Sequence, residues 1–231
     1  MMVKDWYVLC WCAKWLGKNK IMSSALPDHK LYIGEPENDL EVMKELWPLL
    51  DEADIVVAHN CIKFDKRKAY ARFIIHGLLP PSPFKMVDTL RVARSQFAFT
   101  SNRLDDLGEY LGIGKKRDTG GFDLWDECMA GDEKAWKKMI KYCSNDITPL
   151  LEGVYLRFLP YMPNHPNVAV DSTSDVLQCN KCGSKKLIKR GFGYTTAGKY
   201  QRHQCLDCGG WCKDGINLFT KMDRRTKVRN I

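Results

Sequence analysis

The sequence contains no apolar run that approaches the roughly 18 residues needed to span a membrane. It also shows no secretion signal, because Lys4, Asp5 and Lys14 interrupt the first apolar stretch. No internal repeat is present either. We therefore expect a cytoplasmic protein that is not secreted and has no membrane partner. A real core is expected too, since 45% of the 231 residues are hydrophobic.

A disulfide framework is not indicated, although the chain has ten cysteines. Four of them form two Cys-x-x-Cys pairs near the C-terminus, and most of the others are scattered through apolar segments. In the absence of a secretion signal, metal binding and reduced core thiols explain this placement better than disulfides do.

Excess charge is lacking over most of the chain. Residues 1–170 carry 23 basic and 23 acidic side chains, whereas residues 171–231 carry 13 and 5. The whole net charge of +8 therefore lies in the last quarter. A basic appendage on a neutral body suggests a polyanionic partner, most simply nucleic acid. The alternative is a tail that only keeps the protein in solution.

Alternating strand and helix patterns predict an α/β first domain. Strands are expected over residues 6–16, 20–26, 54–60 and 85–90, and helices over 40–53, 65–78, 103–114 and 132–159. Pro48 should kink its helix, and Pro149 should kink or split the last helix one turn after Asp146. The expected organisation is an α/β domain at 1–160, a linker at 161–178, a small second domain at 179–214 and a basic tail at 215–231.

Carboxylates occur where the predicted strands end. Asp65 begins a helix after one strand, Asp88 lies near the end of another, and Tyr142 and Asp146 share one helix face. Ligand sites of α/β sheets collect at strand ends. Carboxylates without a histidine cluster suit Mg²⁺ or Mn²⁺. An aspartate at a strand end is also a common helix cap, so each residue alone is weak evidence.

Taken in order, the segments "AHNCIKFD", "VDTL", "LDDLGEYLGI" and "YCSND" resemble the DnaQ-like 3′–5′ exonucleases. The chain resembles the tyrosine subclass of these DEDD nucleases over about residues 3–160, which implies a ribonuclease H-like mixed sheet flanked by helices. The resemblance implies Asp65 and Asp146 as ligands of catalytic Mg²⁺ or Mn²⁺ in a two-metal hydrolysis of phosphodiesters, with Tyr142 orienting the attacking water. It also places His59, Asn60 and Phe64 near the substrate, although His59 and Asn60 can equally serve only to satisfy the strand end.

The first motif of that family, Asp-x-Glu on a central strand, is not found. Asp39 and Glu41 have the spacing but open a helix, and Asp5 has no glutamate two residues later. We therefore expect a sheet that lacks its first strand and an acidic site that lacks half its ligands. An upstream-encoded fragment would be the partner that supplies them. Cys61 is a second departure, because many relatives have glycine after His-Asn.

Two cysteine knuckles define the second domain. Cys179, Cys182, Cys205 and Cys208 suit a tetrahedral structural Zn²⁺, and the segment resembles the zinc ribbons of transposases and other DNA-associated proteins. A redox dithiol is the alternative, and Cys212 and His203 are spare ligands. The hairpin between the knuckles interleaves aromatic rings with cationic side chains that we expect to bind nucleic acid, namely Lys189, Arg190, Lys199 and Arg202. The rings could instead form a small core.

Three functions remain open at this point. The first is a metal-dependent 3′–5′ exonuclease that needs its first motif from elsewhere. The second is a catalytically inactive module that binds nucleic acid through the ribbon, with DNA preferred to RNA. The third is a ribbon that binds another protein.

Overall fold

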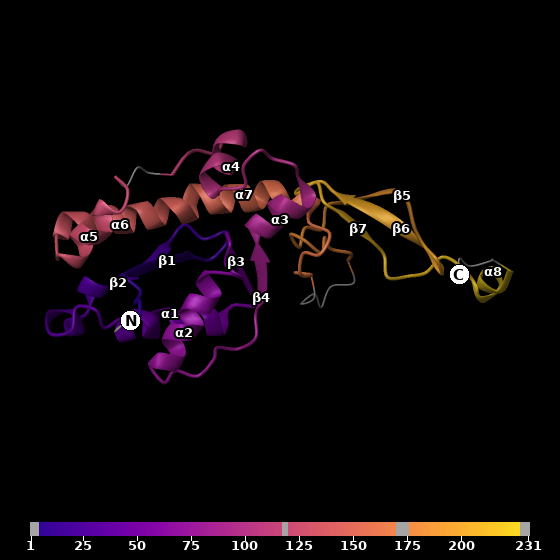
Figure 1. Cartoon of the computed structure of the whole chain (residues 1–231). Coiled ribbons are helices and arrows are strands. Elements are labelled where there is room, and N and C mark those ends of the chain that lie inside the picture. Colours follow the sequence, from indigo (N-terminus) through magenta and orange to yellow (C-terminus); the bar gives the residue numbers. More distant parts are fainter. Residues whose placement is uncertain (1–4, 117–119, 170–175, 227–231) are drawn as a thin grey trace. The chain divides into compact units, whose positions relative to one another are not determined.

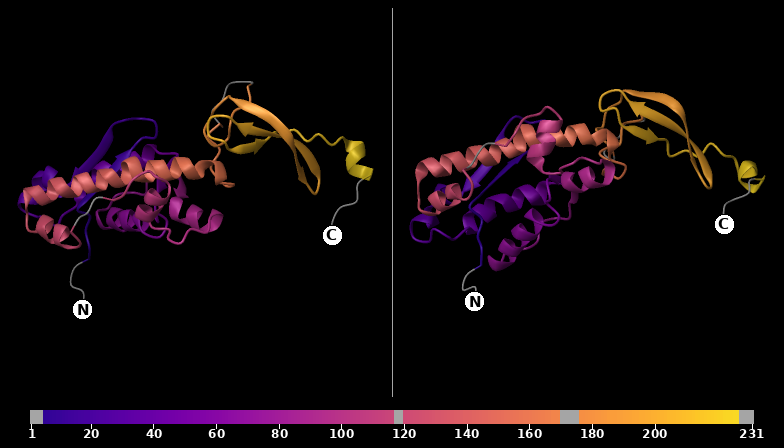
Figure 2. Two further views of the ribbon diagram at one scale, coloured as in Figure 1. Left: turned by 90° about the horizontal axis from the view of Figure 1, so that it is seen from above. Right: turned by 45° about the horizontal axis from the view of Figure 1, so that its top comes forward.

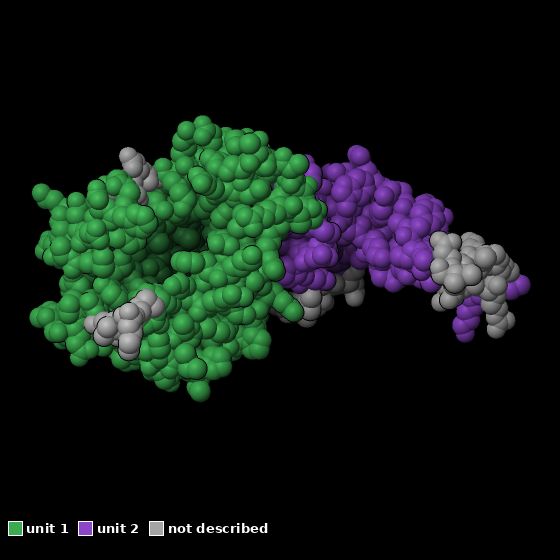
Figure 3. Space-filling view, in the orientation of Figure 1, with its two compact units in different colours: residues 1–157 green, residues 158–231 purple. Residues whose placement is uncertain are grey.

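The computed structural model describes residues 5–116, 120–169 and 176–226. The chain divides into two compact units, residues 1–157 and 158–231, which are coloured separately in Figure 3. Each unit is described by itself. No helix among the described residues is long and apolar enough to cross a membrane.

Unit 1 begins with a β-hairpin. Strand β1 (Cys10–Lys14) pairs antiparallel with β2 (Ile21–Ala25), and Gly17 makes the connecting turn with a φ of 78°. The first strand is shorter than the apolar run at 6–16 predicts. The backbone N–H of Val8 donates to the buried carboxylate of Asp39 at 2.8 Å instead of to a neighbouring strand.

A second pair of strands follows. Strand β3 (Ile55–Ala58) lies parallel to β4 (Lys85–Asp88), with Ala58 opposite Asp88. Within the described residues the two pairs form separate two-stranded sheets, and no strand joins them. All four residues of β3 remain half-buried, although three of them are Ile or Val.

Seven α-helices of unit 1 surround these strands: α1 (Leu40–Glu52), α2 (Asp65–Ile75), α3 (Thr89–Gln96), α4 (Leu104–Tyr110), α5 (Asp123–Met129), α6 (Glu133–Asn145) and α7 (Glu152–Phe158). Figures 1 and 2 show α6 above the hairpin and α1 and α2 below it. The hairpin is therefore the middle of three layers. The main core lies between it, α1, α5 and α6, and includes Leu26, Val42, Leu124, Trp136 and Met139.

Two helix boundaries have clear local causes. The strand predicted over 85–90 ends at Asp88, because that carboxylate accepts the N–H groups of Leu90 and Arg91 and so caps α3. The long helix predicted over 132–159 does break, as predicted, over Asp146–Leu151. There Thr148 has extended backbone angles (φ −135°, ψ 118°), since Pro149 disfavours helical angles in the residue before it.

Other parts differ from the prediction. Helices α3 and α5 were not predicted. Helix α1 runs through Pro48, and the kink expected there stays a prediction. Helix α2 ends near Gly77, as expected, with a φ of 67° and a backbone hydrogen bond from Leu78 back to Phe73.

Unit 2 contains one antiparallel sheet in the order β5–β6–β7, made of β5 (Leu187–Thr195), β6 (Gly198–Cys205) and β7 (Trp211–Lys213). A short helix, α8 (Lys221–Thr226), lies in the stretch predicted as a basic tail. Residues 170–175 of the predicted linker and 227–231 of the tail lie outside the described residues.

Candidate functional site

Asp146 and Tyr142 lie together at the end of α6, as their spacing predicts, and a lysine joins them. The ammonium of Lys116 lies 2.5 Å from Asp146 Oδ2 and 3.2 Å from the Tyr142 hydroxyl. Its Nζ is also 5.3 Å from the centre of the Tyr142 ring. The backbone N–H of Lys116 donates to Asp105 Oδ1, which fixes the start of the side chain. Sequence reasoning did not identify Lys116, because it is 30 residues from Asp146 and its only local signal is its place just after Gly112 and Gly114.

The two oxygens of Asp146 differ. Oδ2 is paired with Lys116, whereas Oδ1 is buried and has no hydrogen-bond partner among the described residues. A buried carboxylate oxygen without a partner is costly, so this atom is suited to a further cation or donor. Cys143 lies beside this residue. Hydrogen bonding with Cys10 and burial raise its pKa to about 12, so the thiol is neutral near pH 7.

Asp65 occupies the first position of α2, directly after the loop that leaves β3. Removal of water from around its carboxyl group and the nearby charge of Asp88 raise the pKa of Asp65, although the residue as a whole is exposed. A cation placed here would relieve this repulsion.

Asp88 has a structural role. It is 4% exposed and its carboxylate accepts backbone N–H groups from both sides, Asn60 at 2.9 Å and Ile62 at 3.3 Å in the loop after β3, and Leu90 and Arg91 in α3. These bonds use its lone pairs and tie β4 to the loop that carries Asp65. Asp88 is therefore the cap of α3, which was the alternative reading of this residue.

His59 and Asn60 shape the same loop. Asn60 has a positive φ of 65°, which a non-glycine residue adopts only when its surroundings hold it there. His59 Nδ1 lies 2.9 Å from Thr89 Oγ1, and burial lowers the pKa of this histidine. Asp88 and Lys116 both act electrostatically on His59, so the loop after β3 and the Lys116 cluster share one neighbourhood. Phe64 is 55% exposed beside Asp65.

The Asp-x-Glu spacing at residues 39–41 does not form a metal site. Asp39 is completely buried and its carboxylate binds Arg72 through Nε and Nη2, with His76 Nε2 2.6 Å away. Arg72 also donates to the carbonyl of Trp6 at 3.0 Å. These contacts hold the segment before β1 against α1 and α2. Glu41 instead pairs with Lys44 at the surface.

The acidic residues of unit 1 do not fit a complete divalent-metal site. Among the described residues, the only group of three or more Cys, His, Asp or Glu side chains close enough to share an ion is the cysteine group of unit 2. Neither Asp65 nor Asp146 therefore belongs to such a group, and Mg²⁺ or Mn²⁺ requires about six oxygen ligands.

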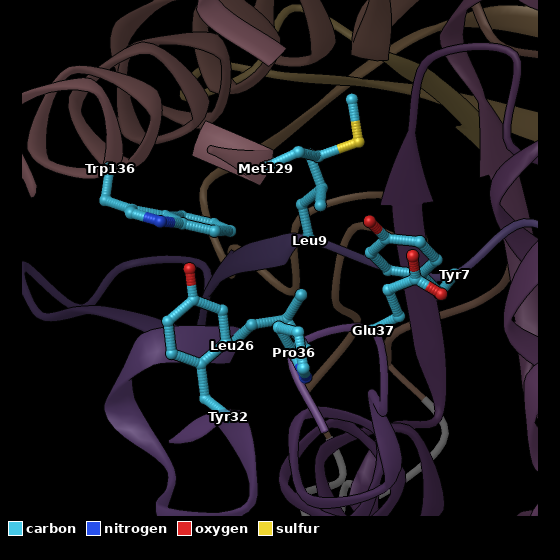
Figure 4. A pocket seen from close by; sticks show the side chains of 8 residues that line it. All are labelled: Tyr7, Leu9, Leu26, Tyr32, Pro36, Glu37, Met129 and Trp136. Carbon is cyan, nitrogen blue, oxygen red and sulfur yellow. The ribbon is translucent and has the colours of Figure 1, made fainter. Parts of the chain in front are cut away.

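A cavity of about 130 Å³ lies elsewhere in unit 1 (Figure 4). It is lined by Tyr7, Leu9, Leu26, Tyr32, Pro36, Glu37, Met129 and Trp136. Trp136 packs edge-on against Tyr32 with ring centres 6.1 Å apart. Its buried Nε1 has no hydrogen-bond partner in the described part of the chain. None of the predicted site residues lines this cavity.

The four predicted cysteine ligands come together in unit 2. All four Sγ atoms lie within 4.8 Å of one another, and the pairs Cys179–Cys208 and Cys182–Cys205 are each 3.7 Å apart. Four sulfurs around a zinc ion, each at 2.3 Å, would be separated by about 3.8 Å. The group therefore fits a tetrahedral metal ion such as Zn²⁺, and unit 2 is compatible with a zinc ribbon.

Backbone N–H groups at this site favour the thiolate form of Cys205, which is the form that binds a metal cation. Burial opposes ionisation of Cys205, but N–H groups of Cys208 and Asp207 and the neighbouring thiols lower its pKa to about 7. The spare candidates point elsewhere. His203 Nε2 lies 2.7 Å from Asp214 Oδ1, and the Cys212 thiol lies 3.9 Å from the His203 carbonyl.

The cationic side chains of the β5–β6 hairpin are largely exposed, as Lys189, Arg190 and Arg202 are, whereas Lys199 is half-buried. Lys199 Nζ lies 4.0 Å from the centre of the Phe192 ring. Phe192 and Tyr194 keep 38% and 68% of their surface exposed. Phe192 and Tyr194 are therefore at the surface, whereas Tyr200 is half-buried.

The layer of strands between helices makes unit 1 an α/β domain. Residues 27–152 match a family model, RNase_H_2, described as RNase_H superfamily. The match covers just over half of the chain, and the protein belongs to this family. Comparisons with curated proteins and with solved structures give no match.

Proposed function

We propose that this protein binds nucleic acid through unit 2 and presents it to a metal-dependent 3′–5′ exonuclease site in unit 1. The site resembles that of DnaQ-like enzymes, and it becomes active only when further carboxylates join Asp65 and Asp146. The observation that carries the proposal is the buried Oδ1 of Asp146, which has no hydrogen-bond partner among the described residues, in a domain of the RNase_H superfamily. DNA is the preferred substrate in this proposal.

The protein's own residues have separate roles in the reaction. Asp146 and Asp65 would be ligands, and Tyr142 would orient the attacking water through its hydroxyl group. His59, Asn60 and Phe64 lie on the loop beside Asp65, where they would contact the 3′ end of the nucleic-acid substrate. The divalent ion, when bound, would supply the positive charge that stabilises the transition state of phosphodiester hydrolysis.

The missing carboxylates would come from an added strand. The described strands of unit 1 form two separate pairs, and β3 is only half-buried although it is apolar. An upstream-encoded fragment with Asp-x-Glu could pair with a free edge, since unpaired edges bind extended segments. Addition of such a peptide to the purified protein should produce nuclease activity that Asp146→Ala abolishes. A peptide with Asn-x-Gln is the matched control and should produce none.

The second candidate is a nucleic-acid-binding module that does not cleave. The Lys116 ammonium favours it, because it already neutralises Asp146 without a metal. A third candidate is a ribbon that binds another protein, with the basic charge of residues 171–231 serving only to keep the protein in solution. Four thiols that must stay reduced to bind zinc make the cytoplasm the proposed location.

Nucleic-acid binding can be tested on the whole protein with a labelled oligonucleotide. The double variant Lys189→Gln, Arg190→Gln should bind more weakly, and the slope of log K against log salt should fall by about 0.7–0.9 for each lost phosphate contact. Lys137→Gln is the control, because it removes an exposed lysine of unit 1, with a side chain 81% exposed on α6. If the control and the double variant bind alike, the hairpin is not the binding surface.

A further inference from the structure

The two faces of the unit 2 sheet differ in what they carry. Residues that pair across strands point to the same face. On one face His203 pairs with Cys212, and His203 is 3% exposed, so this face is covered next to the cysteine group. On the other face Arg202 pairs with Lys213, and Gln204 pairs with Trp211. We name the second set, Tyr200, Arg202, Trp211 and Lys213, the open face.

Rings and cations alternate on the open face. Lys213 Nζ lies 4.4 Å from the centre of the Tyr200 ring, and the Arg202 guanidinium lies 5.5 Å from the centre of the Trp211 ring. Trp211 keeps 44% of its surface exposed, and both cations are exposed. The exposed part of the Trp211 ring, next to two exposed cations, is the kind of surface on which a base can stack.

Glycines keep this face clear. Gly193 stands opposite Tyr200 on β5, so no side chain from that strand covers the ring. Gly191 has a φ of 63°, and a Cβ atom there would lie 3.2 Å from the Arg202 side chain. The Tyr200 ring itself rests on Gly198, where a Cβ atom would lie 2.6 Å from it. Tyr200 is thus held against the sheet, and Trp211 is the more accessible ring of this face.

We propose that the open face binds single-stranded nucleic acid, with a base stacked on Trp211 and phosphates bound by Arg202 and Lys213. This inference deepens the proposed function and rests on it. Charge complementarity selects the occupant, because residues 171–231 carry 13 basic and 5 acidic side chains. Stacking selects the single strand, since the faces of the bases in a duplex are already stacked on one another. From Tyr200 to Gln204 the strand rises about 13 Å, the length of two to four nucleotides, using roughly 3.3 Å per residue.

The test uses the whole protein and one fluorescently labelled oligonucleotide of mixed sequence, offered as a single strand and as a blunt duplex. Trp211→Ala should weaken single-strand binding by about tenfold and leave duplex binding unchanged, whereas Trp211→Phe should retain most of the affinity. The slope of log K against log salt should stay the same in Trp211→Ala and should fall by about 0.7 in Lys213→Gln. Tyr194→Ala is the matched control, an exposed ring on the other face of the same hairpin.

The outcomes separate this inference from the proposed function. If Tyr194→Ala weakens binding and Trp211→Ala does not, the open face is not the binding surface, although the protein does bind nucleic acid. Equal losses for single strand and duplex contradict stacking. If the unchanged protein binds neither probe, both the inference and the proposed binding fail.

A second readout does not depend on the alanine variant being folded. Trp211 is the only tryptophan among residues 158–231, so the difference in emission between the unchanged protein and Trp211→Phe reports on it alone. A single strand should quench this difference signal, and an unchanged signal at saturating oligonucleotide would overturn the proposal.

Discussion

The Lys116 ammonium lies 2.5 Å from the carboxylate of Asp146 and also reaches the hydroxyl of Tyr142, 3.2 Å away. The sequence resemblance assigns both residues, together with Asp65, to chemistry. A lysine therefore binds one oxygen of the carboxylate on which a metal ion would depend. The pair makes Lys116 an internal competitor of divalent cations at Asp146.

Removal of that competitor should strengthen metal binding. We expect Lys116→Met to raise the affinity for Mn²⁺ by up to about fivefold, which corresponds to the ~1 kcal/mol that a partly exposed ion pair contributes. Titration of the purified protein with Mn²⁺, followed by electron paramagnetic resonance, measures this change. Lys115→Met is the matched control, because the neighbouring lysine is exposed and pairs with Glu109 at 2.9 Å. Equal affinity for Mn²⁺ in both variants would show that Lys116 does not compete with divalent cations for Asp146.

The buried pair of Asp39 and Arg72 should dominate the stability of the start of the domain. Arg72→Met leaves a charged carboxylate buried without its main partner, and we expect a loss of about 3–5 kcal/mol in the free energy of unfolding. Lys44→Met, which removes a surface pair with Glu41, should cost less than about 1 kcal/mol. Urea denaturation at neutral pH measures both. A similar small loss in the two variants would contradict the assigned role.

The same carboxylate should make stability sensitive to acid. Burial alone would raise the pKa of Asp39, but hydrogen bonds from Arg72, His76 and the Val8 backbone outweigh it and lower the pKa. Its contribution is therefore complete above the unfolded-state pKa of about 3.9 and is lost as the pH falls through the lower folded-state pKa. The difference in unfolding free energy between the unchanged protein and Asp39→Asn should shrink from pH 7 to pH 3. A difference that stays constant with pH would rule this out.

Metal binding by the cysteine group should hold unit 2 together, because so small a sheet has little core of its own. We expect the double variant Cys182→Ser, Cys205→Ser to lose its zinc and to lose the protection of its β5–β7 amides from hydrogen exchange. Cys212→Ser should keep one zinc per chain, since the Cys212 thiol points to the His203 carbonyl. Elemental analysis with hydrogen exchange tests both statements, and loss of zinc in Cys212→Ser would assign the ligands differently.

The parts that could be predicted from the sequence depend on local patterns. The Tyr142–Asp146 spacing, the break before Pro149 and the paired cysteine knuckles are each encoded within a few residues, and the structure contains all three arrangements. The parts that were missed depend on distant partners. Residues 6–9 were predicted as the first part of a strand, but Asp39, 31 residues after Val8, accepts the N–H of Val8 that a strand would use. The contact of Lys116 with Asp146 spans 30 residues and leaves no periodic signal.

A digest of an oligonucleotide by the unchanged protein, without any added peptide, tests the central claim most directly. The substrate is labelled at its 3′ end in one sample and at its 5′ end in the other, with Mg²⁺ or Mn²⁺ present. The proposal predicts that the protein binds the strand and leaves both labels on full-length product, because Asp65 and Asp146 have no third carboxylate with them among the described residues. Robust shortening from the 3′ end that disappears in Asp146→Ala would contradict this account and show that other acids complete the site.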